Sequence, residues 1–334
     1  MPENAAPYEI VKGILEGASP PRPLFLPIVF SHGARIENVP LRSFLTNPTK
    51  ISNSLRQINA RLRSDGVTCY FDPFLESEAL GATLAWPADN RAPALRWPEG
   101  GIGSEPADIS RSVSRGRVPV ALEVIRRLKT TLRSDSLLMA AVTGPLTLAA
   151  SLTQLDVSNA LERPHPSESS LDVATGAITP IATAFLEAGA SAILIREDFL
   201  PTLSDDGFQD WCSRLAPIVN IIRFYRALPV LLLGSANGVA SNREKILAAG
   251  WDSVVCPVVN GDHRATLSEL GPLAFGIALA PDLFGPGAAA SDFDRWVSEM
   301  VFELRPAVVT TAGDLPAAVD IERLNKLWEN LQRR

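Results

Sequence analysis

The amino-acid sequence predicts an α/β protein that folds as a single (β/α)8 TIM barrel. Short apolar runs alternate with helical patterns eight times along the 334 residues. The apolar runs are continuous, as is typical of parallel strands that are covered on both faces. The sequence contains no GxGxxG after the first strand and no GxxxxGK[ST], so no local motif favours an open nucleotide-binding sheet. Eight consecutive units therefore favour the closed barrel.

The first half of the chain supplies four of the expected strands. They cover residues 23–30, 66–71, 137–143 and 191–195, and the helices between them are expected at 49–64, 121–134 and 177–190. Two Trp-Pro steps within residues 84–98 predict a hairpin or a lid between the second and third strands. The polar stretch 156–171 predicts an exposed loop.

The second half of the chain continues the alternation. Strands are expected at 228–233, 252–258, 273–279 and 306–311, and helices at 206–226, 240–249, 265–271, 290–304 and 320–334. Ser291 or Asp292 is the expected N-cap of the helix at 290–304. We therefore divide the chain into an N-terminal extension, residues 1–22, and one barrel domain, residues 23–334.

Composition excludes several classes of protein. The net charge of −6 and the isoelectric point near 5.3 argue against nucleic-acid binding, which requires a basic face. The chain has no run of about 18 apolar residues and no basic segment followed by an apolar one near its start, so we expect neither a membrane span nor a secretory signal. The three cysteines, Cys69, Cys212 and Cys256, form no close pair. These features predict a cytoplasmic protein with reduced thiols.

Polar and ionisable residues follow several of the predicted strands at the point where each strand ends. They are His32 and Arg35 after the first strand, Asp72 and Glu76 after the second, Arg196, Glu197 and Asp198 after the fourth, and Ser235 and Asn237 after the fifth. In TIM barrels the chemistry gathers at this C-terminal mouth. The pattern therefore favours an enzyme that acts on a small molecule.

Each of these residues also has a structural interpretation. Asp72 could cap the helix that follows it, and Glu76 could be a first-turn acid that complements the helix dipole. Residues 196–199 could form a surface ion-pair cluster. His32 could satisfy a local backbone hydrogen bond. A structural interpretation explains Arg196 less well, because a guanidinium beside an apolar strand needs an anionic partner.

Three segments resemble the uroporphyrinogen decarboxylase superfamily. YFDPFLESEALG, residues 70–81, resembles the second-strand motif of that family, and VFSHGARIENVP, residues 29–40, is similar to its first-strand exit. AAVTGPLTLAASL, residues 140–152, resembles its third-strand segment. The resemblance runs in order over most of the chain and implies the same barrel. The superfamily includes cofactor-independent decarboxylases and methyltransferases that work with corrinoids or folates.

Matched position by position, the decarboxylase residues are largely absent. Asp72 matches the aspartate that engages pyrrole nitrogens, and Arg35 matches an arginine that binds substrate carboxylates. The other arginine is replaced by Ser31, the tyrosine after the third strand by Ser151, and the serine after the fourth strand falls near Asp198. The histidine near the eighth strand has no counterpart. The resemblance therefore does not favour decarboxylation of a porphyrinogen.

The zinc-dependent methyltransferases of the superfamily bind the metal through His-x-Cys after the fifth strand and Cys after the eighth. The matching positions here are Leu233, Ser235 and approximately Gly313, which cannot bind zinc. The resemblance thus implies no metal site of the usual pattern. The DPxxExEALG segment is closer to the methyltransferase-like members than to the decarboxylases.

These observations together predict methyl or one-carbon transfer on a small organic substrate. A corrinoid or tetrahydrofolate would be a co-substrate, and no tightly bound cofactor is expected. Asp72, Glu197 and Asp198 are the expected catalytic residues, and His32, Arg35, Glu76, Arg196, Ser235 and Asn237 the expected substrate-binding residues. A corrinoid protein and a second copy of the chain are the expected partners. The alternatives are a cofactor-independent decarboxylase and a non-catalytic binding subunit in which Arg35 and Asp72 pair with each other.

Overall fold

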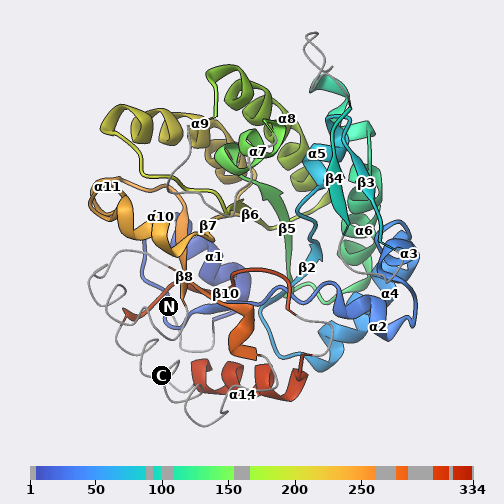
Figure 1. Ribbon diagram of the computed structural model, residues 1–334. Coiled ribbons are helices and arrows are strands. Elements are labelled where there is room, and N and C mark those ends of the chain that lie inside the picture. The colour runs from blue at the N-terminus through green and yellow to red at the C-terminus, as the bar shows by residue number, and fades with distance from the viewer. Residues whose placement is uncertain are drawn as a thin grey trace.

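Eight parallel strands form one nearly closed barrel in the computed structural model, which describes residues 5–87, 93–98, 109–153, 166–259, 276–284, 304–315 and 319–332 (Figure 1). The strands are β1 (Leu24–Leu26), β2 (Gly66–Tyr70), β5 (Leu137–Thr143), β6 (Ala192–Glu197), β7 (Leu228–Leu233), β8 (Val254–Val259), β9 (Ile277–Leu279) and β10 (Val308–Thr311). Their order in the sheet is β1-β10-β9-β8-β7-β6-β5-β2. The prediction of a single (β/α)8 barrel is confirmed.

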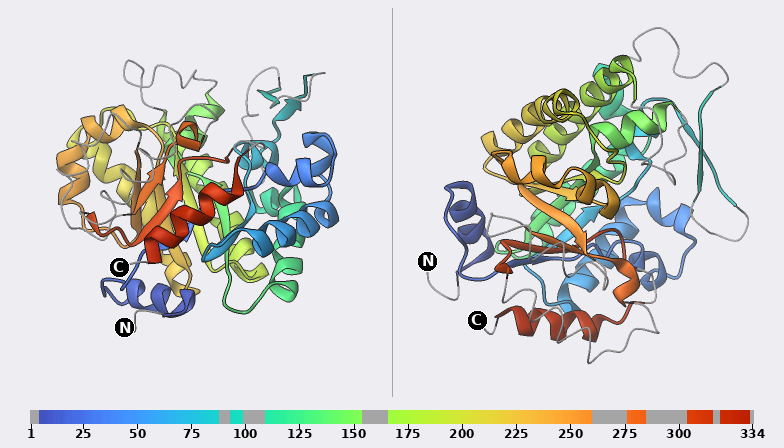
Figure 2. Two further views of the ribbon diagram at one scale, coloured as in Figure 1. Left: turned by 90° about the horizontal axis from the view of Figure 1, so that it is seen from below. Right: turned by 60° about the vertical axis from the view of Figure 1, so that its left-hand side comes forward.

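The helices surround this sheet and cover its outer face (Figures 1 and 2). They are α1 (Pro7–Leu15), α2 (His32–Ile36), α3 (Leu41–Leu45), α4 (Pro48–Arg61), α5 (Leu75–Ala79), α6 (Val118–Thr131), α7 (Pro145–Leu152), α8 (Glu168–Ala188), α9 (Asp205–Phe224), α10 (Ala236–Ser241), α11 (Arg243–Ala248) and α14 (Ile321–Gln332), with 3-10 turns η1 (Ile109–Ser114) and η3 (Pro281–Phe284). Side-chain oxygens of Asn47, Ser167, Ser204 and Ser235 cap α4, α8, α9 and α10, because they accept from backbone N–H groups that the first turn leaves unpaired.

Most of the strands begin and end close to where the sequence predicts them, and β1 is an informative exception. The start of the strand expected at 273–279 lies outside the described residues. β1 ends at Leu26, whereas the apolar run continues to Phe30. Pro27 lacks the N–H that a strand needs. Beyond it, the Ile28 N–H donates to Thr311 Oγ1 at 3.0 Å and the Phe30 N–H to Asp314 Oδ1 at 2.8 Å. Side chains at the end of β10 therefore replace the ladder hydrogen bonds of β1.

The helix expected at 240–249 is divided into α10 and α11. The break lies at Asn242, which is buried and tied to the segment after β6: its Oδ1 accepts from the Leu203 N–H at 2.9 Å and its Nδ2 donates to the Pro201 carbonyl at 2.8 Å. Asn242 thus serves two segments at once, which a local pattern does not reveal. The helices predicted at 265–271 and 290–304, with the caps Ser291 or Asp292, and most of the loop at 156–171 lie outside the described residues.

Residues 84–98 contain the predicted hairpin. β3 (Thr83–Ala85) and β4 (Ala94–Arg96) pair antiparallel, and the hairpin projects from the body of the barrel (Figure 2). The hairpin is confirmed, and its role as a lid remains a prediction.

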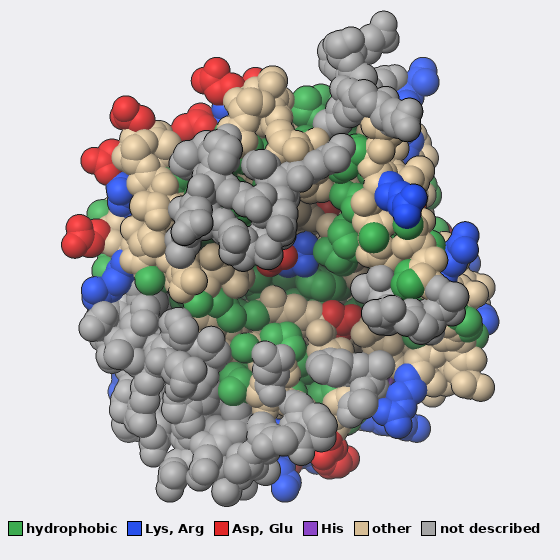
Figure 3. Space-filling view, in the orientation of Figure 1, with side chains coloured by type: hydrophobic (Ala, Val, Ile, Leu, Met, Phe, Trp, Pro, Cys, Tyr) green, Lys and Arg blue, Asp and Glu red, His purple; other side chains and the backbone are tan. Residues whose placement is uncertain are grey.

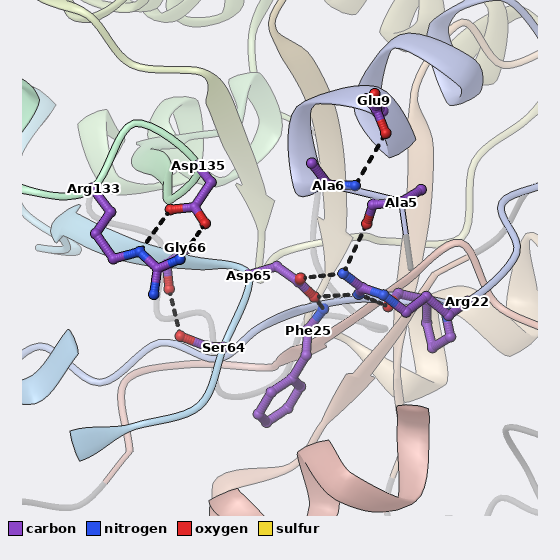
Figure 4. Close-up of polar contacts among 11 residues, drawn as sticks. Ala5, Ala6, Glu9, Arg22, Phe25, Ser64, Asp65, Gly66, Arg133 and Asp135 are labelled. Carbon is purple, nitrogen blue, oxygen red and sulfur yellow. Dashed lines mark hydrogen bonds and ion pairs between the residues drawn. The ribbon is translucent and has the colours of Figure 1, made fainter. Parts of the chain in front are cut away.

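The sheet is open between β1 and β2, and a buried ion pair holds this gap together at the base of the barrel. Arg22 Nη1 and Nη2 donate to the two carboxylate oxygens of Asp65 at 2.8 and 2.7 Å. The same carboxylate accepts from the Phe25 N–H at 2.8 Å, and Arg22 Nη2 also donates to the Ala5 carbonyl at 3.4 Å (Figure 4). The pair therefore links the N-terminal extension, β1 and the start of β2.

One described helix, α8, is long and apolar enough to cross a membrane by length and composition. In the barrel it packs against α6, α7 and α9, and residues along it, such as Ile178, Ile181 and Phe185, are fully buried. Its apolar character therefore belongs to the core of the fold.

Candidate functional site at the barrel mouth

The C-terminal ends of the strands meet on the face that Figure 1 presents. Figure 3 shows a hollow near the centre of this face, where acidic and basic side chains lie among hydrophobic ones. The described exits of β2, β5, β6, β7 and β10 all supply residues to this face, as the sequence predicts for a barrel.

Arg196 is a nearly buried cation at the C-terminal end of β6. In β6, Ile195 faces outward towards α9, so alternation turns Arg196 into the barrel. Its Nη1 lies 3.2 Å from Asp198 Oδ2, and its guanidinium lies over the Phe71 ring, 5.4 Å from the centroid. The side chain is 11% exposed and that of Asp198 is 39% exposed. A nearly buried arginine is thus held by one aromatic face and one accessible carboxylate.

Glu76 is a buried carboxylate on α5 that is tied to the end of β5. Its Oε1 accepts from the Thr143 N–H at 3.1 Å and its Oε2 from Thr143 Oγ1 at 2.8 Å. Thr143 is paired in register with Arg196, so it faces the mouth as well. Burial raises the pKa of Glu76 to about 7, although the Thr143 hydrogen bonds and the charge of Arg196 oppose the shift. Glu76 can therefore change its charge near neutral pH.

Glu197 follows Arg196 and points outward, away from the mouth. It is fully buried and accepts four hydrogen bonds: from the N–H groups of Leu146 and Thr147, from Thr147 Oγ1 and from Trp211 Nε1, at 2.7–3.0 Å. Burial raises its pKa to about 7 against these donors. The carboxylate lies at the N-terminus of α7, where the helix dipole favours an acid.

Gly144 makes this arrangement possible. A Cβ at position 144 would lie 2.3 Å from the Glu197 carboxyl carbon, so a side chain there would displace the acid. Thr147 then connects Glu197 to the mouth, because its hydroxyl accepts from the N–H groups of Asp198 and Phe199 at 2.9 and 3.0 Å. Glu197 thereby fixes the backbone that carries Asp198.

Asp72 is paired with an arginine that sequence analysis missed. Arg117, at the start of α6, forms an ion pair with Asp72 Oδ2, and its Nε donates to Glu78 Oε2 at 2.8 Å. The Asp72 and Arg117 side chains are 3% and 6% exposed. Asp72 Oδ1 also accepts from the Phe74 N–H at 2.8 Å, as in a local turn. Burial lowers the pKa of Arg117, but attraction to Asp72 and Glu78 outweighs it, so the guanidinium stays charged.

The exit of β1 is held by Asp314, which follows β10. Its two oxygens accept from the N–H groups of Phe30 and Ser31, each at 2.8 Å, and burial raises its pKa to about 6. This bond places the start of α2, and with it His32, beside the mouth. His32 is partly exposed, and Arg35, in the last turn of α2, is exposed.

Ser235 and Asn237 lie at the exit of β7. Ser235 Oγ accepts from the Gly238 N–H at 3.1 Å and caps α10, while Asn237 is exposed. A Cβ at Gly234 would lie 2.6 Å from Asp198 Oδ1, so the β7 exit runs directly beside the Arg196–Asp198 pair.

The structure thus brings together three predicted site residues, Arg196, Asp198 and Glu76. Thr143 and Phe71 lie beside them and were not predicted as binding residues. Asp72 and Glu197 are instead engaged in buried contacts. Phe71 had a signal in the sequence, since it stands directly before Asp72 at a strand end. Arg117 lies 45 residues from Asp72, beyond the Trp-Pro segment, and no local pattern connects the two.

No three His, Cys, Asp or Glu side chains of the described residues lie close enough together to hold a metal ion. Of the positions that carry zinc ligands in the resembling methyltransferases, Leu233 is fully buried and apolar, and Ser235 is the cap of α10. Cys256 is fully buried inside the barrel wall, and burial raises the pKa of its thiol well above the usual range. These side chains do not fit a zinc-thiolate site.

A single barrel whose mouth holds a buried arginine beside titratable carboxylates defines a small-molecule site of the TIM-barrel enzyme type. The model of the uroporphyrinogen decarboxylase (URO-D) family matches residues 9–265. The chain therefore belongs to the uroporphyrinogen decarboxylase family.

Methyltransferases are among the proteins to which the chain is similar. The methylcobamide:CoM methyltransferase MtaA of Methanosarcina barkeri is 30% identical over 135 residues, which are 39% of this chain and 38% of the relative. The aligned part thus spans well under half of that protein's length. A methyltransferase from Methanosarcina mazei has the same fold, with a TM-score of 0.76 at 17% identity over 98% of both chains. A B12-independent methionine synthase from Shewanella superposes less well, with a TM-score of 0.50 at 13% identity over 87% of this chain and 88% of that one.

Proposed function

We propose that this member of the family is a methyltransferase that moves a methyl group between a corrinoid and a small anionic molecule bound at Arg196. The observation that carries the proposal is the Arg196–Asp198 pair, in which a nearly buried cation has an accessible partner that a ligand could replace. The methyltransferase relatives favour methyl transfer over decarboxylation. A corrinoid would supply the methyl carrier, and the hollow near the centre of the face that Figure 3 shows supports its access.

The residues of the mouth have distinct proposed roles. Arg196 binds the anionic group, Phe71 holds the guanidinium in place, and Thr143 donates or accepts a hydrogen bond at the same level of the barrel. The Asp198 carboxylate forms the ion pair with the Arg196 guanidinium when no ligand is bound. Glu76 is the proposed acid or base, because its pKa near 7 suits proton exchange at neutral pH. Asp72 and Glu197 become positioning residues, and His32, Arg35, Ser235 and Asn237 form the proposed rim that contacts the rest of the ligand.

Two alternatives differ in what they require. A decarboxylase would keep Arg35 and Asp72 in substrate-binding roles, but Asp72 is buried against Arg117. The hypothesis of a non-catalytic subunit predicts an ion pair between Arg35 and Asp72, whereas the ion-pair partner of Asp72 is Arg117. Neither alternative gains a specific observation. The cytoplasmic location, a corrinoid protein partner and a homodimer remain predictions that accompany the methyltransferase proposal.

An anaerobic spectroscopic assay tests the proposal in both directions. The protein is incubated with cob(I)alamin and a panel of methoxy-, methylthio- and trimethylammonio-carboxylates, and with methylcobalamin and the demethylated acids. Parallel reactions contain tetrahydrofolate or measure release of carbon dioxide. The proposal predicts protein-dependent interconversion of the two corrinoid spectra with at least one acid, and loss of that activity in R196Q. Carbon dioxide release without any methyl transfer would contradict it.

A further inference from the structure

A cavity of about 300 Å³ lies outside the barrel mouth, between α9 and the segment that leads into β8. Its floor is formed by Ile195 and Leu231, which are neighbours in β6 and β7. One wall is the face of α9 that carries Cys212 and Ala216, and the other consists of residues 248–251. Its volume is at the lower end of the range for small-molecule pockets, about 300–1,000 Å³.

The sequence explains why this space is not filled. α11 is a six-residue helix that ends at Ala248, and small residues follow it at Ala249 and Gly250. Ala216 and Cys212 on the facing helix are also small. Side chains of this size do not interdigitate across the gap between two helices, so the barrel wall beneath them remains accessible.

The lining indicates the chemical class of a ligand. The floor is apolar, with Ile195 and Leu231, and Trp251 lines one wall. The polar lining residues are Gln209, Asn220, Ser253 and Asp252, of which Asp252 is charged and exposed. Burial raises the pKa of the Cys212 thiol to about 11, so the thiol is uncharged at neutral pH. A small uncharged ring compound with one polar substituent fits this environment. An anion would meet Asp252 at the rim, and the apolar floor offers no charged partner to an ion of either sign.

An unbroken series of contacts joins the cavity to the mouth. Trp251, in the cavity wall, packs edge-on against Trp211 with ring centroids 5.8 Å apart. Trp211 Nε1 donates to Glu197 at 3.0 Å, and Glu197 accepts from the Thr147 hydroxyl at 2.7 Å. That hydroxyl accepts from the N–H of Asp198, the partner of Arg196. The two hydrogen bonds to Glu197 are buried, whereas Trp251 at one end of the series and Asp198 at the other are partly buried.

We propose that the α9 cavity is a second binding site, for a small uncharged ring compound, and that its occupancy is transmitted through Trp211 and Glu197 to the segment that carries Asp198. A ligand packed against Trp251 restricts the aromatic pair and so stabilises the Trp211–Glu197 hydrogen bond. The mouth then becomes more rigid at Asp198 and Phe199. Neither the binding nor its transmission depends on methyl transfer at the mouth.

Cys212 provides a direct test of binding. Cys69 and Cys256 are fully buried, so among the three cysteines of the chain Cys212 is the accessible one. The rate of its reaction with N-ethylmaleimide is measured by mass spectrometry with p-cresol, benzyl alcohol or cyclohexanol at about 1 mM and above. The proposal predicts that at least one ring compound slows the reaction at least about fivefold at saturation.

Two phenylalanine substitutions on α9 give a matched comparison. A216F fills the cavity from an exposed position, and S213F places the same ring on the solvent side of the helix. Protection of Cys212 should be lost in A216F and retained in S213F. Absence of protection by all three compounds in the unsubstituted protein, or equal protection in both variants, would overturn the binding site.

Hydrogen–deuterium exchange tests the transmission. The ring compound should slow exchange of the Asp198 and Phe199 amides in the unsubstituted protein. W211F removes the indole N–H but leaves the cavity lining intact, so Cys212 should still be protected while the amides no longer respond. An unchanged amide response in W211F, or no response in the unsubstituted protein despite protection of Cys212, would contradict the transmission.

Discussion

Arg196 and Asp198 face each other at 3.2 Å in the barrel mouth, with the arginine nearly buried and the aspartate 39% exposed. Because the aspartate is accessible, the pair suits the proposed anion site, in which Asp198 takes the place of the ligand carboxylate. An external carboxylate would have to compete with Asp198 for the same guanidinium.

This competition predicts opposite effects for the two partners. D198N should strengthen binding of a carboxylate ligand at least about tenfold, since it removes the competing charge, and R196Q should weaken it by at least as much. Isothermal titration calorimetry with the acids of the methyl-transfer panel measures both. R133Q, at an exposed position just before β5 and so at the end of the barrel opposite the mouth, serves as the comparison. Weaker binding in D198N would show that Asp198 contacts the ligand directly.

Glu76 predicts a specific pH dependence of stability. Its pKa is about 7 in the folded protein, against 4.5 for an ordinary solvent-exposed glutamate, so the folded state holds the proton more tightly than the unfolded state. The free energy of unfolding therefore falls as pH rises from about 4.5 through 7, by up to about 3 kcal/mol for a shift of this size.

E76Q should remove this contribution. An amide can still accept from the Thr143 N–H and donate to its hydroxyl, so the fold should persist. Urea unfolding at about pH 5 and pH 8 should show that E76Q loses less stability between the two values than the unsubstituted protein does. E123Q on the exposed face of α6 is the control. Parallel pH profiles for E76Q and the unsubstituted protein would contradict the assignment.

The Asp72–Arg117 pair predicts a stability effect rather than a purely catalytic one. R117M leaves Asp72 buried without its main partner and should destabilise the protein by about 3–5 kcal/mol. The double variant D72N/R117M should recover part of the loss, because no charge remains unpaired. Differential scanning calorimetry of the single and double variants measures the coupling. If D72N instead abolished activity with no change in melting temperature, Asp72 would be a catalytic residue.

Replacing Glu197 by glutamine should lower the free energy of unfolding more than replacing Glu76 by glutamine. All four of its partners donate, so the amide group of E197Q faces donors and leaves at least one of them unsatisfied. A loss of about 1–3 kcal/mol follows for each such buried group. Urea unfolding of E197Q beside E76Q at one pH gives the comparison. Equal stability of the two variants would show that the Glu197 hydrogen bonds contribute little.

The sequence predicted the barrel because its signals are local. The strands at 137–143 and 228–233 have the bounds that their apolar runs predict, and the Trp-Pro steps mark the β3–β4 hairpin. Arg196 and Asp198 were also expected at the mouth, since a strand end fixes where they emerge. Alternation along β6 turns Arg196 into the barrel and Glu197 towards the surrounding helices. A continuous apolar run does not show which of its residues face the barrel interior and which face the helices.

Contacts between distant segments were beyond the reach of sequence patterns. The pairing of Asp72 with Arg117 depends on how α6 returns to the β2 exit after the hairpin. The role of Glu197 depends on Trp211 in α9 and on the turn at Gly144. Asp72 was expected to be catalytic because it matches an aspartate of the resembling family, and Glu197 because it is a carboxylate at a strand end. The structure engages both in buried contacts.

The most direct test of the mouth as an anion-dependent methyltransferase site compares each acid of the panel with its neutral amide. Initial rates of corrinoid methylation are measured anaerobically for the unsubstituted protein and for R196Q. The acid should react at least about tenfold faster than its amide, and R196Q should remove this preference. Equal rates for acid and amide in the unsubstituted protein, or a preference that survives in R196Q, would contradict it.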